Sequence, residues 1–375
     1  MTGRLNRGVP LARRVLFAER RRAVLSVAGV AAALLLVLLL DGIFAGAMAA
    51  NTYYVRTGPA DVVVSQRGVR TMHMSTSVLP TGTLETARAI PGVQWAAPIS
   101  LTTGIVAKGT GRQLSYVIGY DTSSGRGGPR QMVIGHAPAL GEALLDRIAA
   151  DQIGVTVGDT VQVLGTPLRV SGITTGGTSI VNTTTFVSRD EFARLRGTTT
   201  AYVLAKASLG TSADRLAQRL RAALPGVTVQ TRTQFVASEA RITRDMSADL
   251  LRIMTLLSFG IALAVTALTL LTVTLTRLRD HAVVKALGSS SLRLVRTVGA
   301  QAAWTIAAAV AVAVAGAELI SLLLAQVLPT VQVLVTAGSV SRTAVWAAVV
   351  GVLAALGPLP RLARVDPATA FREAA

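Results

Sequence analysis

The sequence contains no cysteine, which excludes disulfide bonds, thiolate catalysis and cysteine-based zinc sites. Charged residues make up only 15% of the chain and aromatic residues 4%. With a mean hydropathy of +0.54, this scarcity of charge argues against an ordinary soluble protein. Acidic residues are the minority, because 19 Asp+Glu stand against 37 Lys+Arg and give a formal net charge of +18. Such a basic balance is typical of both nucleic-acid binders and membrane proteins.

Apolar residues make up 51% of the chain and gather in four long runs. These runs cover residues 24–50, 250–276, 298–328 and 343–359. A bilayer core needs about 20 apolar residues of helix, so the first three runs suffice and the fourth is marginal. Buried core helices of a soluble protein are the alternative, but three runs of this length disfavour it. We therefore predict four transmembrane helices.

The basic residues that flank these runs predict the orientation of the chain. Seven of them precede the first run, five lie between the second and third runs, and three follow the fourth. By the positive-inside rule, segments 1–23, 277–297 and 360–375 are therefore cytoplasmic. Both termini are then on the cytoplasmic side of the cell membrane. The short loop 329–342 is on the outer side, and segment 51–249 forms an extracytoplasmic domain.

A cleavable signal peptide is the alternative for the first run. Ala47-Met-Ala49 is similar to a small-residue cleavage site, and it follows an arginine-rich start. The apolar run is longer, however, than the roughly 7–15 residues of a signal peptide's apolar part. We expect the first helix to stay in the membrane.

Segment 51–249 has the pattern of a mixed α/β domain, with short strands bounded by Gly, Pro and Thr clusters. We expect strands at 61–65, 115–119, 161–164 and 168–173, with a hairpin loop at 165–167. Helical spacing occurs at 142–150 and 212–224. The expected fold class is therefore a four-helix membrane protein with a large mixed α/β domain inserted between helices 1 and 2.

This domain shows no catalytic constellation in its sequence. His73, His136 and His281 are isolated on different segments, which favours structural roles. Asn182-Thr-Thr184 is a glycosylation sequon to which we assign no function. No Gly-Lys dipeptide occurs anywhere, so the chain has no P-loop and cannot hydrolyse ATP alone. We expect no metal or cofactor site, because the domain has no Gly-rich phosphate loop and no His pair at ligand spacing. Nucleic-acid binding is disfavoured because the basic residues flank the apolar runs and are not interleaved with aromatic residues.

Three sets of motifs follow one another along the chain. They are Glu142-Ala-Leu-Leu-Asp-Arg-Ile-Ala-Ala150 with Gly154-Val-Thr-Val-Gly-Asp-Thr-Val161, then Arg277-Leu-Arg-Asp-His-Ala-Val-Val-Lys-Ala-Leu-Gly-Ser289, then Arg364-Val-Asp-Pro-Ala-Thr-Ala-Phe-Arg372. Together with one helix, an outer domain and three more helices, they resemble the FtsX/MacB-like permease family of ABC transporters (type VII). Asp280 and His281 depart from the Glu-Ile or Glu-Phe that is frequent in that family.

The resemblance implies a membrane permease subunit that couples ATP hydrolysis by a separate ATPase subunit to motion of its outer domain. Such subunits export or extract a lipid, lipoprotein, peptide or drug, or transmit motion to a cell-wall process. ATP and Mg would be bound by the partner ATPase, and a second permease chain, identical or different, would complete the transporter among membrane lipids. A non-transport, membrane-anchored sensor or ligand-binding protein is the alternative.

The resemblance also implies that segment 277–297 contacts the ATPase. The candidate coupling residues are Arg277, Arg279, Asp280, Val283, Val284, Lys285, Leu287 and Gly288. Val283, Val284 and Leu287 would form the apolar face of a short amphipathic helix. A basic loop held by anionic lipid headgroups is the alternative. The family's C-terminal motif would comprise Asp366, Pro367 and Ala370.

Three charged residues, Asp41, Arg252 and Glu318, lie within or beside the apolar runs. Asp41 lies about 25 Å along the first helix and Glu318 about 30 Å along the third, at 1.5 Å per residue. Arg252 lies at the outer start of the second helix, so all three are at a similar depth. Because charges in a membrane usually pair, we predict that Arg252 pairs with Glu318 or Asp41. Extension of these side chains to the outer headgroups is the alternative.

Overall fold

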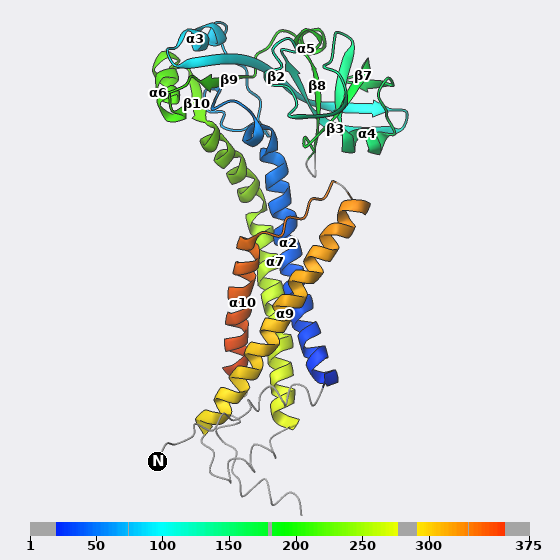
Figure 1. Cartoon of the computed structure of the whole chain (residues 1–375), viewed down its shortest axis with the longest axis vertical. Helices are drawn as coiled ribbons and strands as arrows, with labels where there is room; N and C mark the ends of the chain where they lie inside the picture. The colour runs from blue at the N-terminus through cyan, green and yellow to red at the C-terminus, as the bar shows by residue number, and fades with distance from the viewer. Residues whose placement is uncertain (1–19, 74, 179–181, 277–290, 329, 357–375) are drawn as a thin grey trace, which may run out of the picture. The chain divides into compact units, whose positions relative to one another are not determined.

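The computed structural model describes residues 20–73, 75–178, 182–276, 291–328 and 330–356 (Figure 1). The chain divides into two compact units. The helical unit comprises Met1–Ala45, Ala248–Gln326 and Val333–Ala375, and the outer unit comprises Gly46–Ser247 and Val327–Gln332. Two helices, α2 (Arg20–Thr57) and α7 (Arg232–Thr276), contribute residues to both units.

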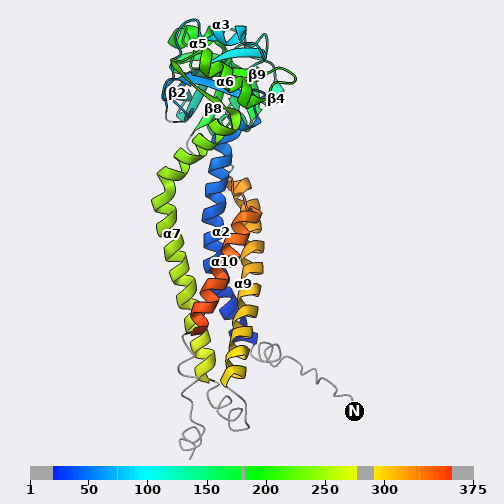
Figure 2. The same ribbon diagram turned by 90° about the vertical axis from the view of Figure 1, so that its left-hand side faces the viewer.

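The helical unit consists of parts of α2 and α7 together with α9 (Ser291–Val327) and α10 (Ala337–Leu356) (Figure 2). Each of the four apolar runs is helical over its described residues, except for Leu328 at the end of the third run. Within that part of the chain, Val24–Thr57 and Ala302–Val327 are long and apolar enough to cross a membrane, whereas Leu256–Leu268 and Ala337–Leu353 are shorter apolar stretches. The crossing of all four helices stays a prediction.

Small residues allow α9 to approach α2 closely. Ala309, Ala313 and Ala317 recur every fourth residue on α9 and are almost completely buried. They belong to one apolar cluster with Val30, Ala31, Leu34 and Leu38 of α2. In a lipid bilayer, such small side chains favour helix association, because they let the two backbones approach and make van der Waals contacts with each other.

The outer unit is built on a sheet of ten strands in its described residues. The strands are β1 (Val62–Gln66), β2 (Val93–Lys108), β3 (Gly111–Tyr120), β4 (Gln131–Gly135), β5 (Glu142–Asp146), β6 (Thr160–Val163), β7 (Thr166–Thr175), β8 (Thr183–Ser188), β9 (Tyr202–Ala207) and β10 (Val227–Thr231). Their order is β10-β1-β9-β2-β3-β8-β5-β7-β4, and β6 pairs with both β2 and β7.

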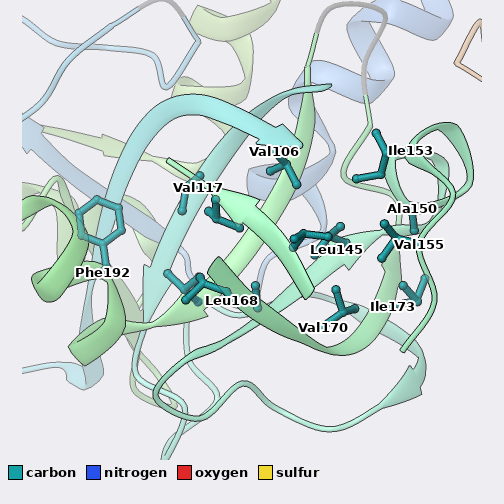
Figure 3. Packing of buried hydrophobic residues seen from close by; sticks show 14 residues of the cluster. Val106, Val117, Leu145, Ala150, Ile153, Val155, Leu168, Val170, Ile173 and Phe192 are labelled. Carbon is teal, nitrogen blue, oxygen red and sulfur yellow. The ribbon is translucent and has the colours of Figure 1, made fainter. Parts of the chain in front are cut away.

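The long strand β2 joins two lobes of the outer unit. Its first half pairs with β9 and its second half, from Ser100, pairs with β3. Helices α3 (Thr83–Ala89) and α6 (Ala213–Ala223) contribute buried residues to the core of the first lobe. Helices α4 (Arg147–Ile153) and α5 (Arg189–Arg196) do the same in the second lobe, whose apolar core is shown in Figure 3.

Most of the predicted elements of the outer unit are confirmed, and one is wrong. The four expected strands correspond to β1, β3, β6 and β7, and the helix expected at 212–224 is α6. The helix expected at 142–150 is instead a strand, β5, followed by α4 from Arg147. The side chain of Asp146 accepts the backbone N–H of Ile148 and so caps α4 where the strand ends. Pairing of β5 with β7 and β8 outweighs the helical spacing of its residues.

The hairpin between β6 and β7 is confirmed, but its turn lies one residue earlier than expected. Val163 pairs with Thr166, so the turn residues are Leu164 and Gly165. Both have positive φ angles, 54° and 85° respectively. This is the backbone of a two-residue type I′ turn, which matches the twist of paired strands.

Candidate functional site

The last residues of α2 are fixed to the outer unit by hydrogen bonds to backbone carbonyls. Tyr54 donates from its hydroxyl to the Gly127 carbonyl at 2.6 Å, in the loop that follows β3. Arg232, the first residue of α7, donates from its guanidinium to the Gly58 carbonyl at 2.9 Å. Its backbone N–H donates to the Asp61 carbonyl at 2.8 Å. The end of α2 and the start of α7 are therefore tied to each other and to β1.

A buried carboxylate fixes α7 to the loop that follows β1. Glu239 is only 2% exposed, and its Oε1 accepts the backbone N–H groups of Met72 and His73. Its Oε2 lies 3.1 Å from Nδ1 of His73. A buried carboxylate is costly unless it is hydrogen-bonded, and bonds to a charged acceptor are stronger than neutral ones. Three donors from one short loop therefore hold that loop against α7.

Aromatic side chains complete this attachment. The His73 ring lies edge-on to Tyr116 of β3, with 5.0 Å between the ring centroids. Tyr202 of β9 donates to the Thr71 carbonyl at 2.8 Å and packs edge-on against Phe235 of α7. Burial, and after it the charge of Glu239, raises the pKa of Tyr202 above its usual range. The tyrosine therefore stays a neutral donor at physiological pH.

A second buried carboxylate, Asp146, holds the loop between β7 and β8. It is 1% exposed and accepts the Gly177 backbone N–H at 3.0 Å and the hydroxyl of Thr178. Burial raises the pKa of Asp146, and hydrogen bonds from Thr178 and Gly177 oppose that rise. Gly176 has a φ of 90°, and a side chain there would overlap the ring of Tyr53 on α2. The loop is thus shaped to lie against α2.

A small cavity lies between these two loops, the end of α2 and strands β2 and β3. Its volume is about 40 Å³, which is room for a few water molecules, since one water needs about 10–15 Å³. Tyr54, Met72, Leu101 and Ile118 supply apolar surface, and His73 and Thr184 supply polar atoms. The cavity is therefore a water-sized space beside one imidazole. In the described residues, no group of three His, Asp or Glu side chains could hold a metal ion.

The structure corrects the pairing predicted for the charges of the helical unit. Asp41 pairs with Arg342 of α10 through both carboxylate oxygens, each 2.6 Å from one guanidinium nitrogen. Among the described residues, Arg252 and Glu318 form no ion pair with each other, and Arg252 forms none with Asp41. Asp41 is therefore already neutralised from within the same unit, by the arginine at the end of the predicted outer loop.

The other predicted site residues lie outside the described residues. These are the coupling residues of segment 277–288 and the tail residues Asp366, Pro367 and Ala370, and their roles stay predictions. Conversely, sequence reasoning missed Glu239 and Asp146 and took His73 as isolated. The residue spacing carries no signal for these contacts, because Glu239 and His73 are separated by 166 positions.

Comparison with known proteins places the chain in a family. Residues 23–223, more than half of the chain, match the model of the MacB-like periplasmic core domain. An uncharacterised ABC transporter permease of Mycobacterium bovis is 25% identical over 354 residues, covering 94% of this chain and 96% of the relative. Another from Mycobacterium tuberculosis is 26% identical over 355 residues, with the same shares covered.

Two solved structures of outer domains are also similar. The periplasmic region of MacB from Actinobacillus actinomycetemcomitans has a TM-score of 0.39 and 13% identity, over 48% of this chain and 92% of that one. The extracellular domain of the transporter YknZ from Gram-positive bacteria has a TM-score of 0.37 and 10% identity, over 46% and 98%. The match to the domain family, on a chain built as a membrane-type helical unit and a mixed α/β outer unit, decides the assignment. The protein belongs to the MacB/FtsX-like family of ABC transporter permeases.

Proposed function

We propose that this chain is one half of a permease in which a separate ATPase drives motion of the outer unit. The observation that carries the proposal is the continuity of α2 and α7. Each is a single helix, of 38 and 45 residues, that begins or ends in the outer unit and includes one of the apolar runs. A tilt or shift of such a helix displaces whatever is fixed to its end.

The buried contacts at these helix ends support this proposal. Tyr54 fixes α2 to the loop after β3, whereas Glu239 fixes α7 to the loop after β1. Both helix ends also pack into one buried cluster, with Val55 of α2 and Phe235 of α7 among its members. A shift of either helix would therefore displace the centre of the outer unit. The chain itself needs no catalytic group for this task, since in this family the ATPase activity lies in a partner subunit.

The finer parts of the proposal follow the sequence. Four helices cross the membrane with both termini in the cytoplasm, and segment 277–297 contacts the ATPase through Val283, Val284 and Leu287. Two permease chains and two ATPase subunits form the working complex, and the moving outer units act on a lipid, lipoprotein, peptide, drug or cell-wall process.

The test is reconstitution with an ABC-type ATPase of the same organism, sought first among the proteins encoded beside the gene. We expect the two proteins to purify together and the permease to change the rate of ATP hydrolysis. Replacing Val283, Val284 and Leu287 with alanine should abolish both effects, whereas a matched control with Ser289 and Ser290 replaced by alanine should retain them. If the chain never associates with an ATPase and instead binds a ligand through its outer unit, the sensor alternative is correct.

A further inference from the structure

Two opposite charges of the helical unit are exposed in a single copy of the chain and form no ion pair within its described residues. Arg252 of α7 and Glu318 of α9 are both exposed. In the part of the chain that the structure describes, neither forms an ion pair, although Asp249 lies only three residues before Arg252 on the same helix. Asp41 is unavailable as a partner, because Arg342 already holds it.

Contacts within the helical unit place the two charges at nearly the same level. Gly29 of α2 faces Val265 of α7, and a Cβ on Gly29 would lie 2.8 Å from that valine. The two helices run in opposite directions, since Ala33 clusters with Phe259 and Leu263. Arg252 precedes Val265 by 13 positions, or about 20 Å, which corresponds to the level of Gly42 on α2.

Glu318 is placed by the contacts of α9 with the same helix. A Cβ on Gly316 would lie 3.4 Å from Leu35, so Glu318 is at the level of residue 37 of α2. Ser321, about one turn after Glu318 on α9, donates from its hydroxyl to the Val333 carbonyl. Leu334, which follows Val333, donates its backbone N–H to the Gly42 carbonyl of α2, so this part of α9 lies near the level of Gly42. The offset between Arg252 and Glu318 along the bundle is thus about five residues, or about 7–8 Å. This offset is within the combined reach of the two side chains.

Lipid is a poor environment for Glu318. The residue lies nine positions before the end of the apolar stretch Ala302–Val327, about 13 Å along the helix. A glutamate side chain is too short to bring its carboxylate to the headgroups over that distance. Its helix neighbours Leu319 and Leu322 are exposed and apolar, as are Ile253 and Leu256 beside Arg252. Charges in such surroundings usually face a partner.

We propose that Glu318 of one copy pairs with Arg252 of a second copy, and that the reverse pair forms at the same interface. The inference rests on the proposed function, which requires two permease chains. If both termini of each copy are cytoplasmic, the two-fold axis runs along the membrane normal, and residues keep their level between copies. A symmetric interface that includes α7 and α9 of both copies then forms two ion pairs, because each copy carries one charge of each sign. Complementary charge within exposed apolar faces selects a second copy as the occupant.

Cross-linking tests the pairing directly, because the native chain has no cysteine. Differently tagged Arg252→Cys and Glu318→Cys chains, expressed together with the ATPase in membranes, are treated with a short bis-maleimide. We expect a covalent dimer that carries both tags, and no covalent dimer when either variant is expressed alone. Cross-linking of either single variant to itself, or no cross-linking of the mixture, would overturn the proposal.

Charge exchange supplies an independent readout. Arg252→Glu or Glu318→Arg alone should raise the dissociation constant of the permease dimer by about 5- to 30-fold, as expected for a polar contact between membrane helices. The double variant should recover the original constant. In the matched control, Glu318→Arg combined with Arg342→Glu should not recover the original dissociation constant, because Arg342 forms its ion pair with Asp41 of the same copy. Recovery in this control, or none in the double variant, contradicts the pairing.

Association with the ATPase separates the two proposals. A wild-type chain that binds the ATPase and forms dimers, yet gives no mixed cross-link, refutes the ion pair and leaves the proposed function standing. Both side chains then extend to the outer headgroups. A chain that stays monomeric and binds no ATPase overturns both.

Discussion

Glu239 of α7 lies 3.1 Å from Nδ1 of His73, a residue of the loop that follows β1, and is 2% exposed. The same carboxylate accepts the backbone N–H groups of Met72 and His73. One side chain therefore provides acceptors for three donors of a loop that is distant in sequence. Since α7 continues into an apolar run, this contact joins the outer unit to a helix of the proposed transmission path.

Glu239→Gln should destabilise the outer unit, because the amide keeps one acceptor oxygen but brings a donor toward His73 or the backbone amides. The loss for a buried group left poorly bonded is about 1–3 kcal/mol. For a domain of about 200 residues this lowers the unfolding midpoint by about 2–12 °C. Thermal unfolding of the full chain would measure it, with the exposed Glu85→Gln on α3 as control. Equal midpoints for the two variants would contradict a structural role for the carboxylate.

The sequence predicts the helices well because long apolar runs have few alternatives to membrane-type helices. It predicts β1, β3, β6 and β7 because their alternation and bounding turns are local signals. It fails at β5, where Glu, Ala and Leu favour a helix locally. Ala143, Leu144 and Leu145 are instead fully buried between β7 and β8, so tertiary pairing decides their structure.

The site was less predictable than the fold because its contacts join distant positions. Asp41 and Arg342 are 301 positions apart, and no spacing rule links them. Sequence reasoning did identify Asp41 as a charge in need of a partner, but it considered only Arg252. The start of the fourth apolar run places Arg342 in the outer loop, whereas the helix that carries it begins at Ala337.

Asp159 should contribute stability that is lost in acid. A hydrogen bond from the Thr156 backbone, followed by the contact with Lys108 at 2.9 Å, lowers the pKa of Asp159 from 3.8 to about 2. A lowered pKa in the folded state means that the contribution is present above pH 3.8 and disappears as the pH falls toward 2. Asp159→Asn should remove this dependence, so the difference in unfolding midpoint between wild type and variant should shrink between pH 5 and pH 2. The exposed Asp151→Asn serves as control, and a constant difference for Asp159→Asn would contradict the assignment.

Ala313→Leu should disrupt the packing of α9 on α2. Ala313 is 1% exposed within the cluster that includes Leu34 and Leu38, so three added carbons have no space. Overpacking of this kind costs about 1–3 kcal/mol. The thermal stability of the purified permease in detergent would show the loss, whereas Ala308→Leu, exposed on α9 and away from the face of Glu318, should leave it unchanged. If both substitutions are equally tolerated, α9 does not pack on α2 through this stripe.

The orientation of the chain can be tested at single cysteines introduced into the cysteine-free sequence. Leu209 is fully exposed in the outer unit, and Ser341 is exposed near the start of α10. With the proposed topology, Leu209→Cys and Ser341→Cys should react with a membrane-impermeant maleimide in intact cells. Thr2→Cys should react only after the membrane is opened, because the arginine-rich N-terminal segment favours the cytoplasmic side. Labelling of Thr2→Cys in intact cells, or protection of Ser341→Cys, would require a different number of crossings.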